Sequence, residues 1–120
     1  MIKAANNLAN ALTHAGRSVE ALPHYEAALE ARSDDYEIHG NYAHALMDAG
    51  RLPNAIVQLD IVSRLKPDSA EAWNNLGVAC ALAGRPAEAR TQFVRAVELA
   101  PDWQEARDNL ARAERQLARP

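Results

Sequence analysis

The sequence repeats itself every 34 residues, and this period constrains the fold more than any other feature. An Ala-Gly-Arg triplet occurs three times at this spacing, and small or apolar residues recur in step around it. Such a period is typical of proteins in which each repeat packs mainly on its neighbours. The aligned positions are Gly16, Gly50 and Gly84; Ala21, Ala55 and Ala89; Tyr25, Leu59 and Phe93; Ala28, Val62 and Ala96; and Leu8, Tyr42, Leu76 and Leu110.

The recurring residues predict pairs of antiparallel helices. Each glycine follows one apolar helical pattern and precedes another, which predicts a left-handed helix end that glycine adopts at least cost. Pro53 and Pro86 follow shortly afterwards and suit a first helical turn, where no backbone donor is needed. The recurring alanines allow two helices to approach closely. The larger side chains at Tyr25, Leu59 and Phe93 then fill the gap beside them.

Carboxylates near the start of alternate helices predict capping boxes. An aspartate stands three residues before a glutamate at three places, one repeat apart. In a capping box the first side chain and the glutamate satisfy backbone N–H groups at the helix start. We therefore interpret these glutamates as caps and not as a row of metal ligands or acid-base groups. The pairs are Asp34 with Glu37, Asp68 with Glu71, and Asp102 with Glu105.

These positions resemble the tetratricopeptide repeat, whose pattern is W-x2-L-G-x2-Y, then A-x3-F, then P. The resemblance covers nearly the whole chain. It implies an all-α fold, a right-handed superhelical α-solenoid of three helix hairpins plus a C-terminal capping helix, seven helices in all. The first two copies are looser, with His39 in the tryptophan place and Ala43 in the glycine place. The third copy matches at Trp73, Leu76, Gly77, Ala89, Phe93 and Pro101, with Cys80 replacing the tyrosine.

The period divides a single domain, 1–120, into three repeats and a half repeat. The half repeat is expected to form a cap with a polar outer face, which solenoid ends need. The first helix has no such cap, and Leu8 and Leu12 are expected on its buried side. We therefore expect a chain cut from a longer array or an amino edge that packs on another copy. The repeats are 2–35, 36–69 and 70–103, and the capping helix is 104–120.

Composition limits the class of function. The chain has 120 residues, 48% of them hydrophobic, which is enough for a core. Its net charge of −3 argues against nucleic-acid binding, which needs basic surface. The single cysteine cannot form an internal disulfide, and no membrane-spanning or signal-peptide pattern is present. We expect a cytoplasmic protein without membrane partners.

No set of residues in the sequence predicts catalysis, a cofactor or a metal site. A glycine-rich phosphate loop and a G-x-S-x-G motif are both missing. His14, His44 and Asp48 lack the spacing of metal ligands. Cys80 lies on an apolar stripe, where cysteine behaves as a small hydrophobic residue. His39 takes the place of a tryptophan and is expected to be packed.

The resemblance implies that the first helix of each hairpin lines a concave groove. On each such helix one stripe of side chains must face the groove. We expect these side chains to contact a peptide segment of a partner protein. The predicted groove residues are Asn7, Asn10, His14, Asn41, His44, Asp48, Asn75, Val78, Leu82, Asn109 and Arg112.

An asparagine recurs at one position of every repeat, at Asn7, Asn41, Asn75 and Asn109. A carboxamide carries both donors and an acceptor, so it can pair with both groups of one peptide unit. This arrangement is similar to the asparagine ladder in the repeat domain of O-linked N-acetylglucosamine transferase. The alternative is that these asparagines satisfy local structure. The sequence leaves both interpretations open.

A second precedent in the family is the carboxylate clamp of chaperone-binding repeat domains, which uses two asparagines and three cations. Asn10 and Asn41 match its asparagine places. The cationic places hold Asn6, Glu71 and Asn75. Because the positive charges that would pair with a carboxylate are missing, we do not expect binding of a chaperone tail.

The sequence thus predicts a non-catalytic protein–protein interaction module that binds a peptide through the asparagine ladder. Two alternatives stay open. The chain can be the substrate-recognition part of a larger enzyme, or a scaffold that self-associates through its exposed edges. The identity of the partner is not encoded in any motif.

Overall fold

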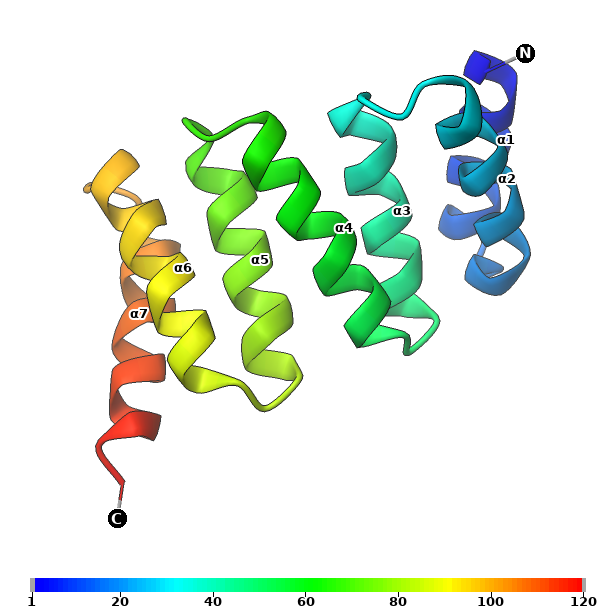
Figure 1. Ribbon diagram of the computed structural model, residues 1–120. Helices are drawn as coiled ribbons and strands as arrows, with labels where there is room; N and C mark the ends of the chain where they lie inside the picture. Colours follow the sequence, from blue (N-terminus) through cyan, green and yellow to red (C-terminus); the bar gives the residue numbers. More distant parts are fainter. Residues whose placement is uncertain (1, 120) are drawn as a thin grey trace. The chain divides into compact units, whose positions relative to one another are not determined.

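The computed structural model describes residues 2–119, and for Ile2 the backbone alone (Figure 1). Within these residues the chain forms seven α-helices and no strand, which confirms the predicted fold class. No described helix is long and apolar enough to cross a membrane. The helices are α1 (Ile2–His14), α2 (Ser18–Ala31), α3 (Tyr36–Asp48), α4 (Leu52–Leu65), α5 (Ala70–Leu82), α6 (Pro86–Leu99) and α7 (Gln104–Leu117).

The chain divides after Leu65 into two compact units. The first unit holds the hairpins α1/α2 and α3/α4, and the second holds the hairpin α5/α6 and the single helix α7. Within each hairpin the two helices run antiparallel (Figure 1). The core of the first unit comprises Ala9, Ala21, Leu22, Tyr25, Ala28, Ile38, Ala45, Leu46 and Ala55. Buried apolar residues of the second unit include Ala72, Leu76, Ala79, Cys80, Ala89, Phe93, Ala96, Ala106 and Ala113.

The three repeated glycines form the predicted left-handed turns. Gly16, Gly50 and Gly84 have φ angles of 78°, 77° and 76°. In each turn the residue after the glycine donates its backbone N–H to a carbonyl in the last turn of the preceding helix, which closes a Schellman-type helix end. These bonds join Arg17 to Leu12 at 2.8 Å, Arg51 to Leu46 at 2.8 Å and Arg85 to Cys80 at 2.9 Å.

The predicted capping aspartates each lie one residue before the observed N-cap position. The side chain of Asp35, not Asp34, caps α3 by accepting from the backbone N–H groups of Glu37 and Ile38. Ser69 caps α5 through the N–H of Ala72. Trp103 precedes α7 and makes no side-chain cap. The cap belongs to the last non-helical residue, and each of these helices begins later than the aspartate pattern suggested.

The prediction that Leu8 is buried is also wrong. Leu8 is 48% exposed, and the buried side chains of α1 are Ala9 and Thr13. Tyr42, one repeat later, packs on the core of the first unit, and its ring centre lies 5.9 Å from that of Tyr25. Helix α2 supplies that cover for α3. Among the described residues no earlier helix offers the same cover to Leu8.

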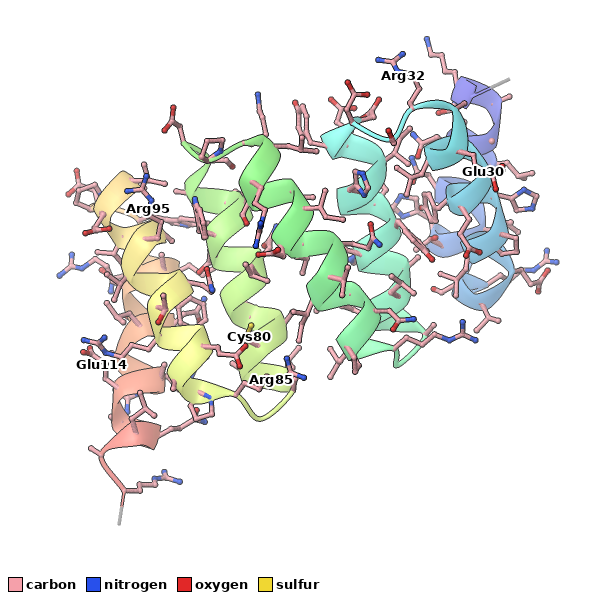
Figure 2. The ribbon with its side chains drawn as sticks, in the orientation of Figure 1. Glu30, Arg32, Cys80, Arg85, Arg95 and Glu114 are labelled. Carbon is pink, nitrogen blue, oxygen red and sulfur yellow. The ribbon has the colours of Figure 1, made fainter. Side chains whose placement is uncertain are left out.

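Helix α7 has the predicted polar outer face. Its buried residues are Ala106 and Ala113, which pack inward. Glu114 of α7 pairs with Arg90 of α6 at 3.5 Å and so joins the two helices (Figure 2, where Glu114 is labelled). The predicted residues of this face, Arg107, Arg112, Glu114, Arg115 and Arg119, are all exposed.

A histidine replaces a tryptophan without loss of a repeated hydrogen bond. The indole Nε1 of Trp73 donates to the carbonyl oxygen of Pro67 at 2.9 Å. One repeat earlier, the ring Nε2 of His39 donates to the carbonyl oxygen of Ser33 at 2.7 Å. The other ring nitrogen of His39 lies 2.7 Å from Oε1 of Gln58. His39 is therefore a packed histidine, as predicted, because both of its ring nitrogens are occupied.

Candidate functional site

Five of the six predicted groove residues of the first unit border two hollows. The smaller, of about 120 Å³, lies between α1, α2 and α3 and is lined by Asn10, Thr13, His14, Tyr25, Asn41 and His44. The larger, of about 690 Å³, contains Asn7 together with Lys3, Asn6, Arg32, Asp35, Glu37 and Ile38. Four of the predicted residues, Asn10, His14, Asn41 and His44, thus meet in one place.

The floor of the smaller hollow is a hydrogen-bonded network around Tyr25. Its hydroxyl donates to Oδ1 of Asn10 at 2.6 Å and lies 3.2 Å from Oγ1 of Thr13. Thr13 in turn donates to the carbonyl oxygen of Ala9 at 2.9 Å. Burial raises the pKa of Tyr25, while its hydrogen bond with Thr13 acts in the opposite direction. The phenol therefore stays protonated at neutral pH. Its hydrogen bond to Oδ1 fixes the side chain of Asn10 within the protein.

Four of the five predicted groove residues of the second unit border an apolar hollow of about 230 Å³ between α5, α6 and α7. Leu82 lines it and is 62% exposed. The ring of Phe93 lines the same hollow from α6. The complete lining is Val78, Ala81, Leu82, Phe93, Asn109, Arg112, Ala113 and Gln116.

The repeated asparagines divide into two groups. Among the described residues, no intramolecular hydrogen bond is made by the side chains of Asn7, Asn41 or Asn75. Asn109 differs, because its Nδ2 donates to Oδ1 of Asn74 at 3.0 Å and its Oδ1 accepts from Arg112 at 3.3 Å. Asn109 therefore serves local structure. The other three carboxamides keep their donors and acceptors available.

Asn74 is a structural residue and not part of a polar lining. It is 1% exposed, and its Nδ2 donates to Oε2 of Glu105 at 3.2 Å. Its oxygen accepts from Asn109, so Asn74 links α5 to two residues of α7. A buried carboxamide that is bonded through both its donor and its acceptor holds neighbouring helices in one register.

We expect Asn74→Ala to lower the free energy of unfolding of the second unit by about 1–3 kcal/mol, because it leaves buried partners unsatisfied. Urea titration followed by tryptophan fluorescence measures this, since both tryptophans lie in the second unit. The matched control is Asn75→Ala, an exposed neighbour with an expected change within about 0.5 kcal/mol. Equal changes in the free energy of unfolding for the two substitutions would show that the hydrogen bonds of Asn74 do not stabilise the second unit.

Some predicted groove residues lie outside these hollows, and some lining residues were not predicted. Asp48 lines none of the three hollows and instead lies 3.5 Å from Nε2 of His44, one turn earlier on α3. Asn75 is exposed and also lines none of them. The unpredicted lining residues that are buried in the core include Thr13, Tyr25, Phe93 and Ala113. Their periodicity marks them as core, and no sequence signal shows that a core side chain also reaches a hollow.

Helix hairpins with glycine turns at a constant period, and hollows on the first helices, define a helical-repeat protein. Comparison with known sequences is consistent with this class. Family profiles described as tetratricopeptide repeat match residues 41–103 and residues 2–33. The chain belongs to the tetratricopeptide repeat family. No curated protein matches it significantly.

Solved structures show the same fold. The first TPR of Spaghetti (RPAP3), bound to the HSP90 peptide SRMEEVD, is 21% identical with a TM-score of 0.88, over 98% of this chain and 94% of that one. The Sgt2 TPR domain from Aspergillus fumigatus is 18% identical with a TM-score of 0.84, over 97% and 78%. YrrB, described as a TPR protein with an unusual peptide-binding site, is 26% identical with a TM-score of 0.81, over 88% of this chain and 54% of YrrB.

Proposed function

We propose that this chain is a non-catalytic protein–protein interaction module that binds a peptide segment of a partner against its first helices. The observation that carries the proposal is the state of Asn7, Asn41 and Asn75. These carboxamides recur at one register of the repeat and make no hydrogen bond to other described residues. A carboxamide in this state can pair with the N–H and C=O of a peptide backbone, which gives affinity without reading the peptide's side chains.

The resemblance to YrrB supports a peptide as the ligand. That protein is described as having an unusual peptide-binding site, and this chain spans about half of its length. Helical-repeat surfaces commonly bind extended partners because their concave faces are long. The ligand class, a protein segment, follows from this likeness together with the available carboxamides.

The RPAP3 domain is bound to a chaperone peptide, but we do not propose the same ligand for this chain. The places of the clamp cations hold Asn6, Glu71 and Asn75. Glu71 is exposed and would repel a carboxylate, and Asn6 carries no charge. A peptide backbone therefore suits the first helices better than an acidic chaperone tail.

We expect Asn7→Ala combined with Asn41→Ala to weaken peptide binding about tenfold or more, since each lost pair of hydrogen bonds contributes on the order of 1 kcal/mol. Peptides selected by display on the unmodified chain provide the ligands, and fluorescence anisotropy measures their affinity. The control is Asn54→Ala, an exposed asparagine on α4, which should leave binding unchanged. Circular dichroism should show equal helicity in all three proteins.

Two outcomes would contradict the proposal. Loss of helicity in the Asn7/Asn41 double variant, in step with loss of binding, would mean that these asparagines are structural. A selection without any enriched peptide would mean that the first helices do not bind peptides in the isolated chain.

The exposed Leu8 favours a second candidate function, self-association through the outer face of α1. Leu8 is 48% exposed, whereas Leu76 at the same position of the third repeat is 2% exposed, so α1 presents an apolar side chain that a helix of another copy could cover. Light scattering over a concentration series tests this. Assembly should increase with concentration and be lost in Leu8→Glu, whereas a strict monomer at every concentration excludes it.

A further inference from the structure

The apolar hollow of the second unit combines an aliphatic wall with a single cationic group. Val78 and Leu82 lie one turn apart on α5 and form one wall, while Phe93 closes the hollow from α6. Phe93 reaches this place because residue 77 is a glycine. A Cβ atom there would lie 2.5 Å from Cε1 of Phe93. An apolar group that covers the exposed side chain of Leu82 removes apolar surface from water, which is energetically favourable.

Arg112 carries the only charge among the described residues that line the hollow. Its Nη1 donates to the neutral Oδ1 of Asn109 at 3.3 Å, and it makes no ion pair with any described residue. Many other arginines of the chain do pair with carboxylates. These are Arg17 with Glu20, Arg64 with Asp60, Arg85 with Glu88, Arg90 with Glu114, and Arg95 with Glu98.

A guanidinium in this state has several N–H donors left, in a planar fork that matches a carboxylate. Gln116 lies one helical turn further along α7 and lines the same hollow, so a second polar side chain is available beside the guanidinium. The charge on Arg112 therefore selects for an anion at the rim, and the aliphatic wall selects for an apolar side chain inside.

We propose that this hollow receives the carboxy-terminal residue of a partner protein when that residue is aliphatic. Its side chain packs on Val78, Leu82 and Phe93, and its α-carboxylate pairs with Arg112. The inference rests on the proposed function, because it assigns the carboxy-terminal residue of a bound peptide to this hollow. It differs from the chaperone clamp, whose predicted places here are Asn6, Asn10, Asn41, Glu71 and Asn75 and include none of these residues.

The carboxylate belongs to a chain terminus and not to an acidic side chain because of the size of the hollow. Arg112 itself lines a space of about 230 Å³, so the carboxylate and the apolar group must lie close together. In a terminal leucine both groups are attached to the same Cα atom. In an internal acidic residue with an aliphatic neighbour, the two side chains point in different directions along an extended peptide.

The first test uses N-acetyl-leucine, which contains only the proposed terminal residue, and the uncharged N-acetyl-leucinamide. Each is titrated into the whole chain while ¹H–¹⁵N spectra are recorded. N-acetyl-leucine should shift the signals of Val78, Leu82, Arg112 and Ala113, and it should bind about tenfold more tightly than the amide. This comparison uses the unmodified protein, so it does not depend on any variant folding.

The second test substitutes the guanidinium. Arg112→Gln, which can still donate to Asn109, should make the acid and the amide bind with equal affinity. Arg107→Gln is the matched control, since Arg107 is an exposed arginine of the same helix that does not line the hollow. It should keep the tenfold preference for the acid.

Equal affinity of acid and amide for the unmodified chain, or shifts confined to other residues, would overturn the inference. So would an amidated peptide with an internal Glu-Leu pair that binds as tightly as a terminal leucine. These results are separable from failure of the proposed function. Displayed peptides can depend on Asn7 and Asn41 and yet be indifferent to a free terminus, in which case the function stands and this assignment falls.

Discussion

Replacing Phe93 with alanine is expected to lower the free energy of unfolding of the second unit by about 3–5 kcal/mol. Phe93 is only 2% exposed and is the largest buried apolar side chain of α6. Its removal loses the transfer free energy of the ring and leaves a cavity between α5 and α6 that backbone movement fills only in part. Urea unfolding followed by the fluorescence of Trp73 and Trp103 measures the change. Arg107→Ala, at an exposed site on α7 of the same unit, should change stability by less than about 0.5 kcal/mol.

The contact between Phe93 and Gly77 can be tested with a double-mutant cycle. Gly77→Ala alone places a Cβ atom 2.5 Å from the Phe93 ring and should cost about 1–3 kcal/mol. Phe93→Leu alone leaves space beside the glycine. Together they recreate the alanine and leucine that Ala43 and Leu59 supply at the same positions of the second repeat. The double variant should therefore lose less free energy of unfolding than the sum of the losses of the two single variants. Strict additivity would show that the two side chains do not compete for space.

Gly84→Val is expected to destabilise the chain by about 1–3 kcal/mol through the backbone alone. The φ angle of Gly84 is 76°, a conformation that is costly for a β-branched residue. No heavy atom lies within 4 Å of a Cβ built at this glycine, so crowding does not contribute. The hydrogen bond from Arg85 to Cys80 depends on the same turn and should be lost with it. Thermal unfolding followed by circular dichroism measures the effect.

Two substitutions serve as controls for the turn. Gly84→Asn should cost less than Gly84→Val, because asparagine tolerates the left-handed region. Gly40→Ala should raise stability by about 0.5–1 kcal/mol, since Gly40 lies inside α3 with open space around a Cβ atom. An unchanged melting temperature for Gly84→Val would contradict this explanation. The left-handed turn would then not be the reason that the Ala-Gly-Arg triplet is repeated in the chain.

The repeat period predicts the helices well because helix boundaries depend on local residues. All seven helices lie within the predicted ranges of the three repeats and the capping helix. Pro86, for example, is the first residue of α6, and Gly84 lies in the turn before it. Turns, helix ends and the apolar stripe are set by residues close together in the chain, so one sequence contains the information needed to place them.

The capping aspartates and Leu8 show where local reasoning fails. The choice between Asp34 and Asp35 depends on which residue is the last one before the helix begins. A shift of one residue in that boundary changes which side chain caps the helix. The burial of Leu8 depends on whether another helix covers it, which periodicity does not show. The first error recurs in every copy, whereas the second concerns a contact that a repeated position makes in one copy and not in another.

The sequence by itself determined the family, the helices and the register of the asparagines, because these follow from a period of 34 residues. Only the tertiary structure decided which carboxamides are available. Asn6, Glu37 and Asn41 occupy the same repeat positions as Asn74, Glu105 and Asn109. In the second set, Asn74 bonds to both partners, while in the first set Oδ1 of Asn6 is buried with no hydrogen-bond partner among the described residues. A hydrogen bond requires an approach of about 3 Å, and that distance is set by how the helices pack rather than by the register of their residues.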